Sequence, residues 1–425
     1  YLTTHLEKIL WLPLPKHLWN QFSAAQLLKS SEPNRQPVGW GAYVIQSWTS
    51  GQAIHMVKNP YYFRAAEGLP KFDFLNFVFL DSVENPVEAV KTGKCDLVDS
   101  TAVSLEHLPT VMESQKSNQI NAIIYPGSSM EMLALGIKPV SYDNSYFPFG
   151  TDRPAYFDDL RTRQAMAACI DRQKIIEKFL SGAMPIPAGV STLYESETSG
   201  QFSAQLFDLP GAEELLSAAG WQDYDQNPAT PRIAVNVKNV PNGRALSVSL
   251  LSSDSPWQKL IAAEIAESLT RCGFSVSQNQ LASEELYQPA PEGPVFGRKF
   301  DLALVSLAVG ENSDCQLFDS REIPTQLNYW LGKSSGGMNF TGYSNADVDA
   351  SCLTAGRSGL DANLAAVSRT RINQLINQEL PVIPLFQQPA VTIFRKELCG
   401  FEKNTQNGFD FSTLDQWDAG ASCPE

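Results

Sequence analysis

Two short segments contain residue types that could bind phosphate or calcium. Gly332-Lys333-Ser334 matches the end of a phosphate-binding loop, but the full motif needs glycine at position 327, which is Leu327. The segment 223–227 opens like a calcium-binding loop, but its sixth position is Pro228 instead of glycine and its twelfth is Ala234 instead of glutamate. We expect an ordinary loop at the first segment and an Asx-rich turn at the second.

The complete metal- and nucleotide-site signatures that we sought are also missing. The sequence lacks the zinc-protease pattern HExxH and the dinucleotide-binding pattern GxGxxG. The histidines are scattered, and no CxxC or His/Cys cluster indicates zinc. We therefore predict that the protein is not an enzyme and holds neither a cofactor nor a metal ion.

Composition excludes further classes of protein. The chain has 425 residues, enough for two or three domains with apolar cores, and is 43% hydrophobic and 18% charged, as in folded globular proteins. No apolar run approaches the ~20 residues that span a bilayer. The net charge of −14, without any block of lysine and arginine, argues against a surface for nucleic acid.

Seven cysteines allow disulfide bonds if the protein is exported. Cys399 and Cys423 flank the C-terminal segment, and Cys315 and Cys352 flank an expected loop region. We expect a bridge within each of these two pairs. Cys169 lies on a predicted amphipathic helix, where we expect a buried thiol. The alternative is that all seven are reduced core residues, since cysteine is often buried.

Short strands and helices alternate along the chain. Runs of β-branched and aromatic residues bounded by turn residues predict strands at 42–45, 53–57, 72–80, 95–98, 233–240, 246–251, 274–276, 300–307 and 382–386. Apolar residues at helical spacing predict helices at 83–91, 160–181, 212–219, 257–271 and 364–378. This order indicates an α/β protein with mixed sheets flanked by helices.

Eight segments occur along the chain in an informative order. They are PVGWGAYVIQSW (37–48), KNPYYF (58–63), AVKTGKCDLVDS (89–100), DDLRTRQAMAACIDRQKIIEKFLSG (158–182), AEELLSAAGW (212–221), GFSV (273–276), NFTGYSNADVD (339–349) and INQLINQELPVIPLF (372–386). In this order the chain resembles the extracellular solute-binding proteins of ABC transporters, family 5, which carry peptides, nickel and some sugars. Each motif alone is weak, but together they cover nearly the whole chain.

The resemblance implies a fold of two lobes, the large-cluster, type II class of periplasmic binding proteins. Lobe I would use residues 1–145 and 388–425, and lobe II residues 150–387, with the Pro- and Gly-containing stretch 141–155 at the boundary. The segment WLPLPKHLW (11–19) resembles a stretch that relatives reach only after half of their first lobe. We therefore expect an incomplete lobe I and a chain that begins partway through the family pattern.

The resemblance also implies which residues face a ligand between the lobes. In peptide-binding relatives the stretch at 306–311 carries a tryptophan and an aspartate that holds the peptide amine, whereas this chain has Leu307 and Gly310, which argues against ordinary peptides. Amides at Gln387 and Gln388 would suit a polar, uncharged or hydroxyl-rich ligand. Trp40 could instead be a core aromatic, and Glu131 a solvent-facing carboxylate. The predicted ligand-binding residues are Trp40, Met130, Glu131, Ser306, Leu307, Gly310, Glu311, Asn339 and Gln387.

The function implied by the resemblance is capture of a peptide-like or other small polar solute for an ABC permease. The protein would be a monomer in the periplasm or on the outer face of the cytoplasmic membrane, held by a lipid anchor if the missing N-terminal segment carries one. Two alternatives share the fold: a binding module coupled to a receptor, and a fragment that binds nothing.

Overall fold

A computed structural model describes residues 14–79, 85–144, 153–190, 204–310, 313–325, 337–358, 361–401, 403–404, 408–409 and 411–423. Its contacts divide the chain into two units: unit 1 comprises Tyr1–Tyr125 and Pro389–Glu425, and unit 2 comprises Pro126–Gln388. Both passages between the units fall inside long strands. The first lies about fifteen residues before the predicted boundary stretch of 141–155, and the second is next to the predicted one.

Unit 1 contains a three-stranded antiparallel sheet made of β1 (Tyr43–Thr49), β2 (Ala53–Lys58) and β3 (Phe74–Val78). The C-terminal segment is tied to the loop after β2, because the Asp415 carboxylate accepts hydrogen bonds from the Tyr62 hydroxyl at 2.8 Å and the Arg64 guanidinium at 2.7 Å. The other elements of unit 1 are α2 (Lys16–Trp19), α3 (Ala24–Leu27), α4 (Ser31–Arg35), α5 (Pro86–Lys91), α6 (Leu108–Lys116), β12 (Leu398–Cys399), β13 (Lys403–Asn404), β14 (Gly408–Phe409) and β15 (Asp418–Ala419).

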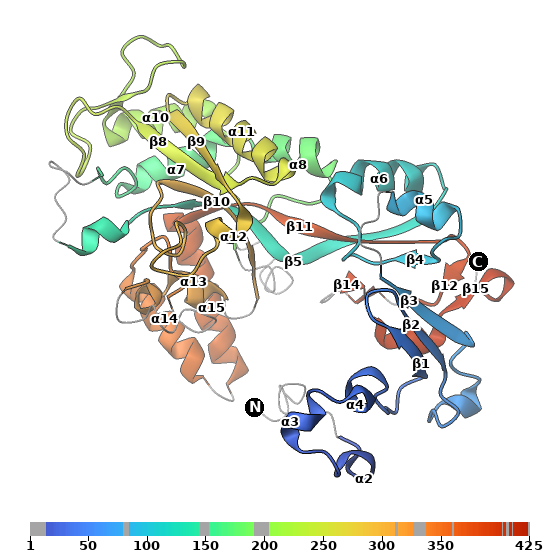
Figure 1. Ribbon diagram of the computed structural model, residues 1–425. Coiled ribbons are helices and arrows are strands. Elements are labelled where there is room, and N and C mark those ends of the chain that lie inside the picture. Colours follow the sequence, from blue (N-terminus) through green and yellow to red (C-terminus); the bar gives the residue numbers. More distant parts are fainter. Residues whose placement is uncertain are drawn as a thin grey trace. The chain divides into compact units, whose positions relative to one another are not determined.

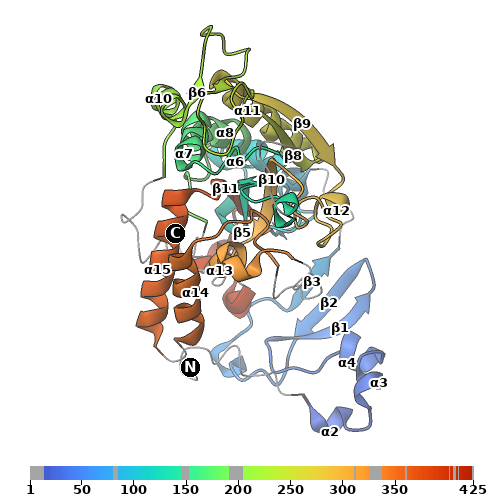
Figure 2. The same ribbon diagram turned by 90° about the vertical axis from the view of Figure 1, so that its left-hand side faces the viewer.

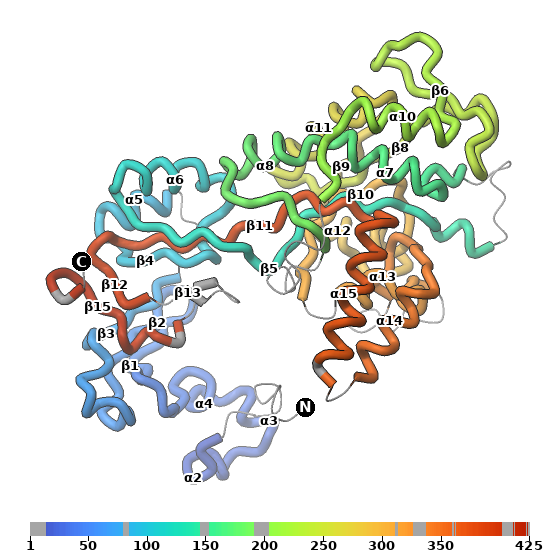
Figure 3. The backbone as a smooth tube through the Cα atoms, turned by 180° about the vertical axis from the view of Figure 1, so that it is seen from behind, coloured from blue at the N-terminus to red at the C-terminus, as the bar shows by residue number. Residues whose placement is uncertain are grey.

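The main sheet has six strands in the order β4-β11-β5-β10-β8-β9 (Figure 1). They are β4 (Leu97–Val98), β5 (Asn121–Leu135), β8 (Ser247–Ser253), β9 (Ser275–Leu281), β10 (Leu302–Ala308) and β11 (Val382–Phe394). β10 pairs antiparallel with β5 and parallel with β8, so the sheet is mixed, and the α/β fold class is confirmed. The neighbouring strands β5 and β11, which carry the chain between the units, run side by side (Figure 3).

Helices cover both faces of the sheet in unit 2 (Figure 2). One face packs against α7 (Leu160–Cys169), α8 (Arg172–Leu180), α10 (Leu209–Ala219) and α11 (Pro256–Arg271), and the other against α13 (Ser313–Phe318), α14 (Ala346–Arg357) and α15 (Ala362–Glu379). Side chains alternate between faces along a strand. Met130, Met132 and Ala134 of β5 therefore share one hydrophobic core with Phe318 and Phe340.

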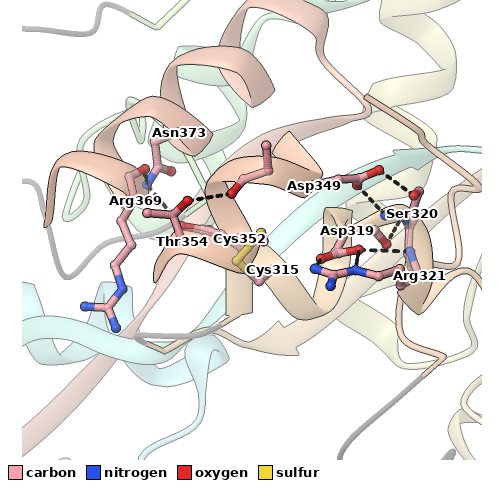
Figure 4. Close-up of a disulfide and its surroundings, with 12 residues drawn as sticks. Cys315, Asp319, Ser320, Arg321, Asp349, Cys352, Thr354, Arg369 and Asn373 are labelled. Atoms are coloured by element: carbon pink, nitrogen blue, oxygen red, sulfur yellow. Dashed lines mark hydrogen bonds and ion pairs between the residues drawn. A yellow bond between two sulfur atoms is a disulfide. The ribbon is translucent and has the colours of Figure 1, made fainter. Parts of the chain in front are cut away.

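Three disulfide bonds are present among the described residues. Cys399 is bonded to Cys423, and Cys315 to Cys352, so both pairs expected from the sequence are joined. Figure 4 shows the second bridge between α13 and α14, beside the ion pair of Asp319 and Arg321 and the hydrogen bonds from Ser320 to Asp349.

The prediction of a free buried thiol at Cys169 is wrong, and so is the alternative of seven reduced cysteines. Cys169 is bonded to Cys272, at a sequence separation of 103. Cys169 is the last residue of α7 and Cys272 directly follows α11, so packing of these helix ends brings the two sulfur atoms together. Cys95 remains as a free thiol.

Candidate functional site

Glu131 of β5 is a carboxyl group buried inside unit 2. Its side chain has an exposed fraction of 0%, and its register partner on the neighbouring strand β10 is Ser306. The strand places it here because β5 is otherwise apolar beyond residue 129, so every second residue must enter the core that covers that face. Glu131 was predicted to contact the ligand, but its carboxyl group is wholly enclosed and does not reach the surface of unit 2. The same burial excludes the alternative of a solvent-facing carboxylate.

Two glutamine amides hold the two oxygens of Glu131. Gln258, in the first turn of α11, donates from Nε2 to Glu131 Oε1 at 2.8 Å, and its own Oε1 accepts from the backbone N–H of Ser253 at 3.1 Å. Since a backbone N–H can only donate, this second bond fixes which end of the Gln258 amide faces Glu131. Gln388 of β11 donates from Nε2 to Ser306 Oγ at 2.8 Å and to Glu131 Oε2 at 3.3 Å.

A tyrosine completes this group, which we call the Glu131 cluster: Glu131, Gln258, Tyr287, Ser306 and Gln388. The Tyr287 hydroxyl accepts the backbone N–H of Ser306 at 2.8 Å. Burial raises the pKa of Tyr287 to about 12, with a smaller contribution from the nearby Glu131. The phenol therefore stays protonated at physiological pH and acts as a neutral hydrogen-bonding group.

Burial also raises the pKa of Glu131 to about 8. Hydrogen bonds from Gln258, Gln388 and Ser306 favour the ionised form, but they offset only part of the cost of desolvation. No cation belongs to the cluster in the described part of the chain. At neutral pH Glu131 is consequently a protonated carboxyl group, with one acceptor and one donor like the amide of glutamine.

The cluster includes two half-buried residues of unit 2, Ser306 and Gln388, which we call the polar strip. Gln387 is half-buried as well, but its side chain lies on the other face of β11, because neighbouring residues of a strand alternate between faces. The Gln387 amide donates to the carbonyl of Gly127, the second residue of unit 2. The strip, which includes the neighbouring Gln388, thus lies where both strands leave unit 2, and its side chains are a hydroxyl and an amide. Such groups can exchange hydrogen bonds with water for hydrogen bonds with a ligand.

Other predicted ligand contacts have different surroundings. Met130 is wholly buried in the hydrophobic core of unit 2, on the sheet face opposite to Glu131, so its sulfur does not meet the polar strip. Asn339 is also fully buried, and its amide donates to the carbonyls of Asp319 at 3.0 Å and Tyr343 at 2.9 Å. These bonds give Asn339 a structural role in its turn. We therefore remove both residues from the candidate site.

The remaining predicted residues are distributed as follows. Leu307 is half-buried against the hydrophobic core, and the N–H of Gly310 donates to Ser313 Oγ at 2.7 Å, which shapes the start of α13. Trp40 belongs to unit 1 and is 79% exposed, so the alternative of a packed core aromatic is wrong. Glu311 lies outside the described residues.

Sequence reasoning missed Gln258 and Tyr287. Gln258 is one of many polar residues near a helix start, and its burial follows from the packing of α11 on the sheet. Tyr287 follows a single helical turn, α12 (Ser283–Leu286), which has no periodic signal. Only the apolar surroundings of Glu131 in sequence could have hinted that a polar partner must be buried with it.

The described residues form neither a group that could hold a metal ion nor a helix that could cross a membrane. Within the described ranges, no three His, Cys, Asp or Glu side chains form a group that could hold a metal ion. The 223–227 segment forms Asx turns, as expected: Asp223 accepts the N–H of Gln226 at 2.8 Å, and Asp225 accepts the N–H of Asn227 at 3.1 Å. None of the described helices is both long and apolar enough to cross a membrane.

One segment of the sequence fits the spacing of a catalytic motif. Residues 332–336 read GKSSG, which also fits the GxSxG spacing of a serine nucleophile, although they lie outside the described residues. A serine nucleophile of this kind requires a histidine base. All four histidines of the sequence have numbers below 126, so unit 2 itself supplies none.

Comparisons with known proteins agree on one family. The protein-family model described as "Bacterial extracellular solute-binding proteins, family 5 Middle" matches residues 4–322. The chain is 21% identical over 414 residues to the oligopeptide-binding protein AppA of Bacillus subtilis, covering 95% of this chain and 66% of that protein. It is 24% identical over 383 residues to the probable deoxycholate-binding periplasmic protein YgiS of Escherichia coli, covering 88% of this chain and 59% of that protein. The chain therefore spans slightly less than two-thirds of the length of these relatives.

Solved structures show the same fold at low sequence identity. A putative peptide-binding protein AppA from Clostridium difficile matches with a TM-score of 0.67 and 18% identity, covering 96% of this chain and 72% of that chain. NikZ from Campylobacter jejuni, solved in complex with Ni(L-His), matches with a TM-score of 0.60 and 17% identity, covering 95% of this chain and 72% of that chain.

Proposed function

Because the chain belongs to the bacterial extracellular solute-binding proteins of family 5, we propose that it captures a small solute for an ABC importer. The observation that carries this proposal is the fold, which matches that of solute-binding proteins over nearly the whole chain. Relatives are named as an oligopeptide-binding protein, a probable di/tripeptide-binding protein and a probable deoxycholate-binding periplasmic protein. A peptide-like or other small polar solute is the ligand class that we propose.

The setting of this function follows from the family. We propose that the protein works in the periplasm or on the outer face of the cytoplasmic membrane, as a monomer that delivers its ligand to a membrane permease. A lipid anchor is a further part of the proposal. Units 1 and 2 would be the two lobes of the binding protein.

On unit 2, we propose that ligand contacts come from the polar strip and its neighbours. Ser306, Leu307, Gly310 and Gln387 are the proposed contacts, and Gln388 joins them because it shares the hydrogen-bond network of Ser306. Glu131 would act from beneath this strip. Trp40 of unit 1 and Glu311 stay predictions.

Catalysis is not part of the proposal. Relatives are named as binding proteins, and the Glu131 cluster contains neither a nucleophile paired with a base nor a described metal-binding group. Its single carboxyl group is enclosed by amides and hydroxyls, which suits recognition.

Native mass spectrometry of the purified chain tests the proposed function. We expect a complex heavier than the chain alone, and denaturation should release a peptide or another polar solute that can be identified. A chain that carries nothing is then titrated with a tryptic digest of casein while its Tm is measured. A bare mass together with an unchanged Tm would contradict the proposal.

A further inference from the structure

We propose that the Glu131 cluster makes the ligand contact on unit 2 uncharged, so that the site selects a neutral amide or hydroxyl group over a carboxylate, an ammonium group or a metal ion. In this proposal Gln388 and Ser306 touch the ligand, and Glu131 is the residue that positions them. The inference rests on the proposed function and adds the chemistry of the ligand to it.

Hydrogen bonds connect the buried carboxyl group of Glu131 to the half-buried side chains of Gln388 and Ser306. Glu131 is fully buried, so it cannot contact a ligand itself, but it accepts from Gln388, which also donates to Ser306. On its other oxygen, Glu131 is held by Gln258, whose orientation is fixed by the N–H of Ser253. The half-buried side chains are thus oriented from below by a chain of bonds that begins at the backbone.

The elements that pack on Glu131 contribute uncharged side chains to the cluster. β10 contributes Ser306, and β11 has no charged residue between positions 382 and 394. On α11 the contact is Gln258, and the neighbouring Lys259 is exposed. Tyr287 stays neutral because burial raises its pKa to about 12. Glu131 itself is fully buried and its printed partners are neutral amides, so burial without a cation in the cluster favours the protonated form at neutral pH and leaves the cluster without a formal charge.

The consequence for a ligand is energetic. A carboxylate or ammonium group placed against this strip would lose water without gaining a counter-charge from the Glu131 cluster as described, which is costly in a half-buried setting. An amide or hydroxyl group would only exchange hydrogen bonds with water for bonds with Gln388 and Ser306. Peptide backbone amides and saccharide hydroxyls share this chemistry, and the experiment distinguishes between them.

The test is isothermal titration calorimetry of the full chain with four probes. Two probes have no ionic groups, N-acetyl-trialanine amide and maltotriose. The two that we call charged contain ionic groups or a metal ion: free trialanine, with an ammonium group and a carboxylate, and the nickel–histidine complex. We expect binding of one uncharged probe, which identifies the amide or the hydroxyl source, and no binding of the charged probes at the same concentrations. Gln388→Ala should weaken binding at least tenfold, whereas the control Gln222→Ala, on the short strand β6 (Trp221–Gln222), should leave it unchanged.

The pH profile separates positioning by Glu131 from a merely structural role. If only the protonated form binds, a pKa of about 8 implies that affinity falls about thirty-fold between pH 7 and pH 9.5. Glu131→Gln copies the protonated form, so this variant should bind at pH 7 and show no such fall.

Three results would overturn the inference. If trialanine or the nickel complex binds and neither uncharged probe does, the inference is overturned but the proposed function is supported. Loss of binding at pH 7 in Glu131→Gln, with Tm unchanged, would show that a carboxylate is required. Failure of all four probes would count against both the inference and the proposed function.

Discussion

Replacement of Glu131 by glutamine should make the protein more stable, relative to the wild type, as pH rises. The folded state keeps the proton of Glu131 up to a pKa of about 8, whereas the unfolded chain releases it near the ordinary glutamate pKa of 4.5. Between these two values the folded state binds about one proton more than the unfolded state. The free energy of unfolding of the wild type therefore falls by about 1.4 kcal/mol per pH unit in this interval.

The total effect follows from the width of the interval. Three and a half pH units correspond to about 5 kcal/mol, which is present in full below pH 4.5 and lost in full above pH 8. Glutamine cannot ionise, so the variant lacks this pH dependence. Its amide oxygen keeps an acceptor for Gln258 Nε2, whereas its NH2 group replaces the oxygen that accepts from Gln388 Nε2. The difference between the two proteins isolates Glu131 from all other titrating groups.

Urea unfolding at several pH values between 4.5 and 9, followed by tryptophan fluorescence, measures this difference. The matched control is Glu213→Gln, since Glu213 is an exposed glutamate on α10 in the same unit. We expect a difference that grows with pH for Glu131 and stays constant for Glu213. A constant difference at Glu131 would refute the reasoning, because it would mean that the buried carboxyl group ionises as easily in the folded state as in the unfolded chain.

Three further predictions concern the stability of unit 2. Asp314→Asn should gain stability over the wild type as pH rises from 3.8 to about 7, because burial raises the pKa of Asp314 to about 7. The same urea series measures this gain, and a stability difference that does not change with pH would contradict the prediction. Joint replacement of Cys169 and Cys272 by alanine should lower the free energy of unfolding by about 5 kcal/mol under oxidising conditions, since the bridge closes a loop of about 100 residues; an unchanged urea midpoint would refute this. Thr162→Val should cost about 1–3 kcal/mol, because the buried indole N–H of Trp221 loses its acceptor at 3.1 Å, whereas Thr162→Ser should keep the bond and lose less.

Elements with strong local signals could be predicted from the sequence. The helix expected at 212–219 is α10, which ends at Gly220 in the left-handed conformation with φ of 101°. A side chain there would meet the carbonyl oxygen of Val235 at 2.5 Å, so glycine is required. The strands expected at 246–251 and 300–307 correspond to β8 and β10 within two residues at each end.

Other elements depend on information that is not local. The helix expected at 160–181 is two helices, because Ile170 is extended and the Asp171 side chain accepts the N–H of Lys174 at 2.9 Å to begin α8. Asp171 interrupts an otherwise helical pattern, which is a weak signal on its own. The strand expected at 382–386 continues to residue 394 as β11, since Gln387 and Gln388 find partners on neighbouring strands that their own sequence does not reveal.

The candidate site shows the same division between local and distant information. Glu131, Ser306 and Gln387 could be proposed because they fall at recognisable positions in the order of motifs. Whether such a residue packs in the hydrophobic core or beside the polar strip depends on the sheet face: Met130 and Glu131 are both fully buried, but on opposite faces of β5.

The protonation of Glu131 follows from the same long-range packing. A glutamate in sequence is expected to be ionised, and only the combined presence of α11, β10 and β11 around it removes water without supplying a cation. Chemistry read from residue types alone would assign a negative charge to this site, whereas the structure assigns a neutral one. Because that difference reverses which ligand groups the site should accept, measuring the ionisation of Glu131 bears directly on which solutes the protein can bind.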